Sequence, residues 1–251
     1  MVGVRIQQAA RAALMSAGLL GLSVMAAFGQ PASIPAQAEV QAPAPIENAS
    51  LDRRQNEPGK FDYYVLALSW SPSYCQAAQE RAPNRAPDQQ CSGRPFSFVV
   101  HGLWPQYERG FPSYCQVPAP RLDRRIVGSM LDLMPSPRLI FHEWDRHGSC
   151  SGLSANAYFE TVRKARAVVK IPSDYLALDQ PVSVTPGAVA EAFVKANPGL
   201  SRANFAIACD KKRLTEIRFC IGKDFSFHDC PDMARRSCRL DTIVMPAVRG
   251  G

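Results

Sequence analysis

Three of the four histidines in this 251-residue chain fall in two short segments. Residues 98–105 read FVVHGLWP, and residues 141–150 read FHEWDRHGSC. Two imidazoles that titrate near neutral pH can serve one reaction as base and acid. A carboxylate and a guanidinium beside them can stabilise the negative charge that develops in a transition state. This set of groups suits the attack of a hydroxyl group on a phosphodiester.

The spacing of the second segment predicts that its polar groups share one side of a helix. Each residue of an α-helix advances about 100° around the axis. With His142 at zero, Arg146 falls at about 40° and Glu143 at about 100°. His147 follows at about 140°, whereas Trp144, at about 200°, faces the side where a core would lie. The alternative is that these are scattered polar groups on a solvated surface.

This chemistry needs no metal ion when RNA is the substrate, because RNA carries its own nucleophile, the 2′-hydroxyl group. A zinc hydrolase is one alternative, but its motif H-E-x-x-H places two histidines one helical turn apart. Here His142 and His147 are five residues apart, which would splay their rings by about 140°. The chain also lacks a Cys-x-x-Cys pair, so we expect no metal site and no cofactor. A second alternative is an exported RNA-binding or toxin-like protein without catalysis.

Two predicted strands lead to the histidine of the first segment. Residues 61–70 are aromatic at their start and then apolar, which is typical of a buried strand. Residues 76–95 are polar and contain three prolines, so we expect a loop there. A second strand over residues 96–100 would place His101 at its C-terminal end, where rigid scaffolds often hold catalytic groups.

The rest of the chain mixes helices and strands without a regular βαβ order. The helices are predicted at residues 121–134, at 158–166 with Ser154 as N-cap, and from 185–186 to 198–199, and the strands at 205–209 and 214–221. The predicted fold class is therefore α+β, with a central, largely antiparallel sheet flanked by helices.

The first 58 residues are expected to lie outside this fold. Two arginines precede an uncharged apolar run at residues 12–28, which is the pattern of a signal peptide, and we assign residues 1–29 to it. A membrane anchor is the alternative, but the run is short for a bilayer span of about 20 residues. Residues 30–58 contain five prolines and few large apolar groups. We expect a flexible segment there, followed by one domain at residues 59–251.

The charge and the cysteines are consistent with an exported protein that has an anionic partner. Without the two arginines of the signal peptide, 27 of the 29 basic residues remain against 22 acidic ones, a mild excess of +5. All eight cysteines follow the signal peptide. An even number in an exported chain indicates disulfides, although spacing alone does not pair them.

The two histidine segments resemble the paired signature motifs of the ribonuclease T2 family, H-G-L-W-P and H-E-W-x-K-H-G. The first motif is complete at residues 101–105, and the second departs only at Arg146, where the family usually has lysine. Residues 64–70 resemble the first strand of the family, and the resemblance extends over about residues 60–240. It implies the fold of that family and a bacterial, exported endoribonuclease. The implied disulfides are Cys75–Cys91, Cys115–Cys150, Cys209–Cys238 and Cys220–Cys230.

The resemblance also implies a role for each polar residue of the two segments. His147 matches the general base toward the 2′-hydroxyl, and His101 matches the general acid toward the 5′-oxygen. His142 matches the phosphate-binding histidine, and Glu143 and Arg146 match the pair that stabilises the pentacoordinate phosphorus. The implied product is a 2′,3′-cyclic phosphate, which is hydrolysed more slowly to a 3′-phosphate. Because arginine keeps the positive charge and binds phosphate bidentately, we expect activity to be retained.

Base binding is less well defined by the resemblance. Trp104 matches the first base position, although a core tryptophan is the alternative, and Gln106 and Tyr107 follow it as further substrate-binding candidates. At the second base position, an aromatic residue common in the family is replaced by Leu139, with Phe141 displaced. Since stacking tolerates every base, we expect low base specificity.

The expected partner is single-stranded RNA, bound by a monomer that is periplasmic or secreted and not attached to the membrane once the signal is removed. The fourth histidine, His228, belongs to neither motif and is expected to be structural or exposed. Arg235, Arg236 and Arg239 are expected to form a solvated face, with a role in holding RNA as the alternative.

Overall fold

The computed structural model describes residues 56–248. The predicted signal peptide and nearly all of the predicted flexible segment lie outside this range. The strands are β1 (Tyr63–Trp70), β2 (Phe98–Gln106), β3 (Val182–Val184), β4 (Phe205–Cys209), β5 (Leu214–Ile221) and β6 (Ile243–Met245). The helices are α1 (Ser71–Arg81), α2 (Gln89–Ser92), α3 (Arg124–Met130), α4 (Pro137–Arg146), α5 (Ala155–Val168), α6 (Pro186–Ala196) and α7 (Pro231–Ala234), with 3₁₀ turns at Gly148–Cys150 and Ser173–Tyr175.

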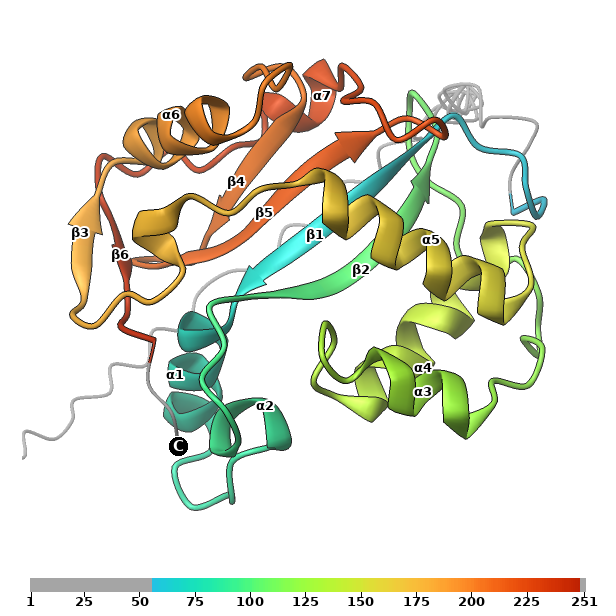
Figure 1. Ribbon diagram of the computed structural model, residues 1–251, viewed down its shortest axis with the longest axis horizontal. Helices are drawn as coiled ribbons and strands as arrows, with labels where there is room; N and C mark the ends of the chain where they lie inside the picture. Colours follow the sequence, from blue (N-terminus) through green and yellow to red (C-terminus); the bar gives the residue numbers. More distant parts are fainter. Residues whose placement is uncertain (1–55, 249–251) are drawn as a thin grey trace, which may run out of the picture. The chain divides into compact units, whose positions relative to one another are not determined.

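Four strands form one antiparallel sheet in the order β2-β1-β5-β4, and β3 pairs with β6 in a separate two-stranded ribbon. Figure 1 shows α5 crossing the sheet over β1 and β2, with α6 near β4 and the α3–α4 pair beside β2. All four disulfides implied by the resemblance are formed. The predicted α+β fold with a largely antiparallel sheet is therefore confirmed.

The two faces of the sheet have different roles. On β1, Tyr64, Leu66 and Leu68 belong to the main hydrophobic core, which α5 and α6 complete. The opposite face carries a smaller cluster in which Tyr63 and Val65 pack with Cys220 of β5, with Cys230 and with Trp104. This second face is the one that the first histidine segment reaches.

His101 is the extra residue of a β-bulge. Ala67 pairs with Gly102 and Leu68 pairs with Val100, so His101 has no partner of its own on β1. Before the bulge the even-numbered residues Phe98 and Val100 point into the main core, and after it the odd-numbered Leu103 and Tyr107 do so. The bulge therefore shifts the alternation of β2 by one residue, from even-numbered to odd-numbered core positions. As a result, Trp104 lies on the second face.

Several predicted boundaries are wrong. Residues 76–95, predicted as a loop, include most of α1 and all of α2, because Pro72 lies in the first turn of a helix, where its missing N–H is no loss. β2 continues to Gln106, so His101 lies in the middle of a strand and not after its end. The helix predicted at residues 121–134 is shorter, at Arg124–Met130. β3 and β6, of three residues each, were not predicted.

Residues before 59 already contact the domain. Asn56, which falls in the predicted flexible segment, accepts a hydrogen bond from the backbone N–H of Ser113 at 2.9 Å. Gly59 donates to the carbonyl of Cys150 at 2.9 Å. Within residues 56–248, every helix is too short or too polar to cross a bilayer.

Candidate active site

A single cleft of about 330 Å³ brings the two histidine segments together. It is lined by all five residues predicted to act in catalysis, His101, His142, Glu143, Arg146 and His147. Trp104, Gln106 and four residues not predicted for the site, Phe111, Arg218, Met233 and Arg236, complete its walls. The two segments are 36 residues or more apart in sequence, so the sheet and α4 must hold them in register.

α4 positions four of the five groups. Its N-cap, Ser136, accepts a hydrogen bond from Leu139 N–H at 3.4 Å, and Pro137 occupies the first turn. Trp144 is 1% exposed, as the helical spacing predicts, and its indole N–H donates to the Pro120 carbonyl at 2.6 Å. His147 follows the last helical residue as C-cap.

Glu143 is buried between α4 and β2, with 2% exposure. Its Oε2 accepts a hydrogen bond from the indole N–H of Trp104 at 2.7 Å. The carboxylate lies against the backbone of Gly102, where any Cβ would overlap it. Glycine is thus required at this position by the close approach of the helix to the strand, which gives the second residue of the H-G-L-W-P motif a physical reason.

His101 is held from behind by a second carboxylate. Its Nδ1 lies 2.6 Å from Oε2 of Glu216 on β5, and its Nε2 lies 3.6 Å from Oε1 of Glu143. Glu216 is 5% exposed and also accepts from Arg218 Nε at 2.6 Å and from Ser69 Oγ at 3.3 Å. Only the Nε2 side of the imidazole is left to face the cleft.

The surrounding charges set the protonation state of His101. Burial lowers its pKa, but the hydrogen bond and the charge of Glu216, together with Glu143, outweigh burial and raise it above the ordinary value of 6.5. The pKa of Glu216 is lowered: burial opposes this, but the hydrogen bond and charge of His101 and the charge of Arg218 prevail. The contact between His101 and Glu216 therefore favours the charged form of both groups.

The pKa of His147 is shifted in the opposite direction from that of His101. Burial, together with the positive charge of Arg146 and of the other two histidines, lowers its pKa to about 3. Its Nδ1 is buried without a hydrogen-bond partner, and its ring lies 5.4 Å from the Trp104 ring, centroid to centroid. The imidazole is therefore neutral at neutral pH and able to accept a proton. Burial also raises the pKa of Glu143 to about 7, although His101 and Trp104 oppose the shift.

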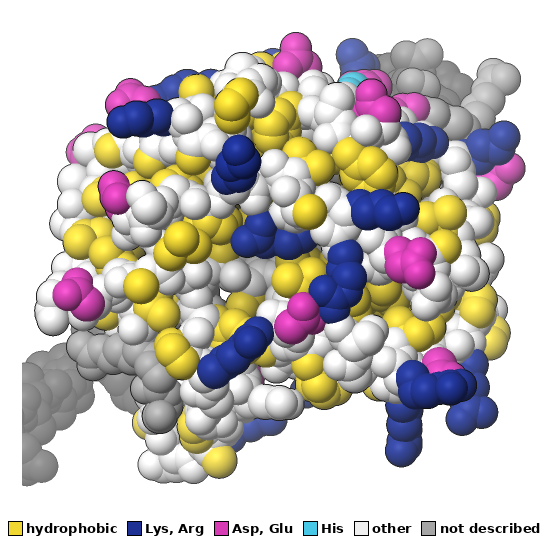
Figure 2. All heavy atoms as spheres, viewed as in Figure 1, with side chains coloured by type: hydrophobic (Ala, Val, Ile, Leu, Met, Phe, Trp, Pro, Cys, Tyr) yellow, Lys and Arg dark blue, Asp and Glu magenta, His cyan; other side chains and the backbone are white. Residues whose placement is uncertain are grey.

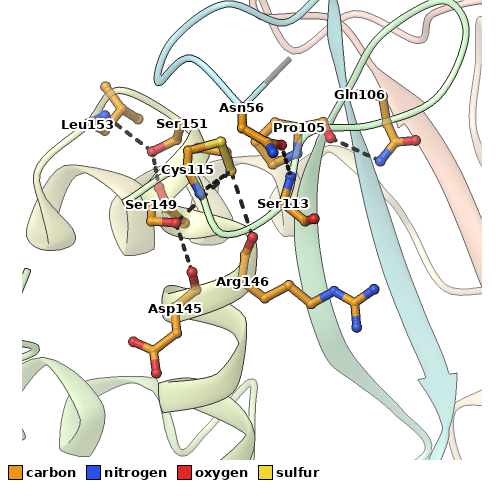
Figure 3. Close-up of a disulfide and its surroundings, with 12 residues drawn as sticks. Asn56, Pro105, Gln106, Ser113, Cys115, Asp145, Arg146, Ser149, Ser151 and Leu153 are labelled. Atoms are coloured by element: carbon orange, nitrogen blue, oxygen red, sulfur yellow. Dashed lines mark hydrogen bonds between the residues drawn. A yellow bond between two sulfur atoms is a disulfide. The ribbon is translucent and has the colours of Figure 1, made fainter. Parts of the chain in front are cut away.

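The Cys115–Cys150 disulfide fixes the end of α4 to the loop after β2 (Figure 3). Tyr114 N–H donates to the Arg146 carbonyl at 2.8 Å, and Cys115 N–H lies 3.2 Å from the Cys150 sulfur. Figure 3 shows the Arg146 side chain extending from the helix end toward β2, away from Asp145. Its guanidinium carbon lies 5.9 Å from the Tyr114 ring centroid, and its Nε is buried without a partner.

Of the three residues predicted to bind bases, two line the cleft and one does not. Trp104 lines the cleft, half-buried, and its ring is flanked by His147 and by the Arg218 guanidinium at 5.4 Å. Gln106 also lines the cleft, but its amide donates to the Pro105 carbonyl at 3.0 Å. Tyr107 is 3% exposed, belongs to the main core and lines an adjacent hollow of about 160 Å³. Phe141 is exposed but lies outside the cleft.

Sequence reasoning missed Glu216 and Arg218, which stand two residues apart on a strand that is otherwise largely apolar. That pattern is a usable signal, because a buried strand seldom carries two charges on one face without a partner. Arg236 lines the cleft, which agrees better with the alternative of a role in holding RNA than with the expected solvated face. His228 stacks on Tyr63 at 4.5 Å and lies 3.2 Å from a Glu108 oxygen, as expected of a histidine outside the site.

Comparison with known proteins shows to which family the chain belongs. The sequence model of the Ribonuclease T2 family matches residues 61–230. The chain belongs to the ribonuclease T2 family. A ribonuclease of Aeromonas hydrophila is 44% identical over 118 residues, which are 47% of this chain and 51% of that protein. A probable ribonuclease of Haemophilus influenzae is 36% identical over 135 residues, which are 50% of each chain.

The chain thus matches about half the length of each of these two relatives. Among solved structures, an RNase-related protein from Calystegia sepium superposes with a TM-score of 0.58 at 20% identity, covering 75% of this chain and 98% of that one. At this identity the likeness concerns the fold, which nearly the whole of that protein shares with this chain.

Proposed function

We propose that the protein is an endoribonuclease that cleaves single-stranded RNA by transphosphorylation without a metal ion. The observation that carries this proposal is the pair of histidines whose pKa values are shifted in opposite directions in one cleft. The pKa of His147 is lowered to about 3, which keeps it neutral, and the pKa of His101 is raised, which favours its protonated form. Groups whose environments separate their pKa values in this way divide the work of base and acid.

The first step begins at His147. Its neutral imidazole takes the proton of the 2′-hydroxyl, and the oxygen attacks the adjacent phosphorus. A bound phosphodiester brings a negative charge into the site and raises the pKa of His147 from its low value, so proton transfer becomes easier only when substrate is present. His142 and Arg146 bind the phosphate oxygens, and Arg146 carries an unpaired buried N–H toward them.

The step is completed at His101. As the bond to the 5′-oxygen breaks, the imidazolium donates its Nε2 proton to the leaving oxygen, and Glu216 keeps the ring oriented through Nδ1. Glu143, with a pKa of about 7, can give a proton to an equatorial phosphate oxygen as negative charge grows there. The product is a 2′,3′-cyclic phosphate. In its slower hydrolysis to a 3′-phosphate, the two histidines exchange roles.

Low base specificity follows from the cleft walls. Trp104, Phe111 and Met233 present apolar surface, and contact of this kind accepts every base. We further propose that the protein works as a monomer in the periplasm or outside the cell. Four disulfides support export, because such bonds persist in oxidising compartments.

The proposal is tested with DNA oligonucleotides that carry a single ribonucleotide, incubated with oxidised protein in EDTA. The wild type should cut only after the ribonucleotide and leave a 2′,3′-cyclic phosphate, detected by mass spectrometry. His147→Ala and His101→Ala should each lower the rate by about 10²- to 10⁴-fold. His228→Ala is the matched control, because that histidine lies outside the cleft. Equal cleavage by His147→Ala and the wild type would sink the assignment.

A further inference from the structure

A second hollow, of about 480 Å³, lies beside the N-terminal half of α4, between that helix and the α1–α2 segment. Three arginines line it: Arg81 at the end of α1, Arg85 in the following loop and Arg138 on α4. All three are exposed. Within residues 56–248, none of them makes an ion pair or a side-chain hydrogen bond, so their charges are available to a ligand. The acidic residue that lines the same hollow is Asp88.

Asp88 is already engaged by the protein. One of its carboxylate oxygens caps α2 by accepting from Gln90 N–H at 3.1 Å, and the other accepts from the Tyr74 hydroxyl at 2.5 Å. The second bond holds the phenol ring in place at the wall of the hollow, where Tyr74 is 40% exposed. The Cys75–Cys91 disulfide ties the same segment together. The hollow thus combines excess positive charge with one oriented, partly exposed aromatic ring.

This hollow and the catalytic cleft border the same helix, α4. Arg138 and His142 are four residues apart on α4, and side chains at that spacing lie on the same face, separated by about 6 Å along the axis. Arg138 lines the hollow and His142 lines the cleft. A strand whose scissile phosphate binds at His142 can therefore present its neighbouring phosphate to Arg138.

Positive charge is not confined to this hollow, because on the face drawn in Figure 2 Lys and Arg side chains are spread among hydrophobic, neutral and acidic groups, with several close together at the lower right. What distinguishes the hollow is the combination of arginines with an aromatic ring. Arginines that share a hollow with an aromatic side chain are suited to single-stranded nucleic acid, since the guanidinium groups bind phosphates and the ring stacks on a base.

We propose that the hollow formed by Tyr74, Arg81, Arg85 and Arg138 is an accessory RNA subsite, which binds phosphates and a base of the strand beyond the scissile position. The inference rests on the proposed ribonuclease function and extends it. The enzyme would then favour polynucleotides over dinucleotides, because a dinucleotide has only the scissile phosphate and cannot reach the arginines.

The experiment uses substrates that contain one ribonucleotide in a DNA strand, which fixes the cleavage position. A dinucleotide is compared with eight-residue strands extended on the 5′ or the 3′ side. For the wild type, kcat/KM should be at least about fivefold higher on one of the extended strands. The variant Arg85→Ala/Arg138→Ala should lose that gain and leave dinucleotide cleavage unchanged. Arg202→Ala, which removes an arginine that contacts α6, should keep it.

A binding measurement tests the hollow separately from catalysis. An all-deoxy eight-residue strand cannot be cut, and fluorescence anisotropy gives its affinity against salt. The double variant should bind more weakly, with a slope of log affinity against log salt that is smaller by about 0.7 for each phosphate that the protein no longer neutralises. Tyr74→Ala should also weaken binding, with the slope unchanged.

The outcomes separate the two proposals. If the wild type cuts none of the substrates, the ribonuclease function is wrong. If it cuts them all with the same kcat/KM, or if the double variant matches Arg202→Ala in both rate and salt slope, the accessory subsite is wrong while the function stands.

Discussion

Replacing Glu216 with glutamine would test whether the Glu216 carboxylate raises the pKa of His101. The substitution keeps the shape of the side chain and removes the charge that lies 2.6 Å from Nδ1. That charge raises the pKa of His101, so its loss lowers the pKa and leaves less of the imidazole protonated at neutral pH. If His101 is the general acid, as proposed, it governs the basic limb in the profile of kcat/KM against pH, and this limb should move to lower pH. The acidic limb, assigned in the same proposal to His147, should stay in place.

The size of the effect follows from the kind of bond that is removed. Glu216 is 5% exposed and its partner is an imidazolium, so the bond is charge-assisted in a site with little water. A hydrogen bond to a charged group contributes about 1.5–3 kcal/mol. Since about 1.4 kcal/mol is a factor of ten, kcat/KM should fall about 10- to 150-fold on an ordinary dinucleotide.

A substrate with an activated leaving group separates an acid role from general damage. The 4-nitrophenyl ester of uridine 3′-phosphate releases a phenolate that needs no proton, so the defect of Glu216→Gln should shrink markedly on it. Ser69→Ala is the control, because it removes a 3.3 Å bond to the same carboxylate without changing its charge, and it should remain close to wild type. An unmoved basic limb, or equal losses on both substrates, would refute the role given to Glu216.

Three further substitutions test other contacts of the site. Burial raises the pKa of Glu143 to about 7, so the contribution of this one group to folding stability falls as pH rises from about 4.5 through about 7. Glu143→Gln should therefore be more stable than the wild type at pH 8, by about 1–3 kcal/mol, but not at pH 4. Urea unfolding at both pH values measures the free energy of unfolding of each variant. An equal difference between the two variants at both pH values would contradict the prediction. Gly102→Ala places a Cβ on the Glu143 carboxylate and should lower kcat/KM about 100-fold or more by displacing it, whereas Gly128→Ala, with open space around its Cβ, should have no effect on steady-state rates. Arg146→Lys should stay within about tenfold of wild type because the charge is kept, and Arg146→Met should lose far more; a loss above about 100-fold for the lysine variant would show that the site depends on the planar guanidinium group.

The local part of the site could be predicted from sequence because it depends on short-range periodicity. The spacing of His142, Glu143 and Trp144 fixes their directions once a helix forms, and the burial of Trp144 agrees with it. The helix itself is defined by Ser136 and Pro137, which are ordinary start signals. The disulfide pairing, by contrast, came only from the resemblance, since spacing among eight cysteines leaves many alternatives open.

The parts that could not be predicted depend on long-range pairing. Glu216 is 115 residues from His101 in sequence, and its contact exists only because β1 lies between β2 and β5. The bulge at His101 is likewise a property of two paired strands, so residues 96–106 read alone predicted a shorter strand. α1 was missed because Pro72 can end a strand or begin a helix, and here it does both.

The bulge at His101 also has a consequence for how this gene can change. Because His101 is the extra residue, deleting one residue at the bulge would restore regular pairing with β1 and leave Leu103 in the main core and Trp104 on the second face. A one-residue deletion after the bulge would instead turn the residues beyond it to the opposite face of the sheet, because side chains alternate along a strand. Substitutions in β2 alter one contact at a time, whereas such a deletion would change several at once. We therefore expect the length of this segment to be under stricter selection than most of its side chains.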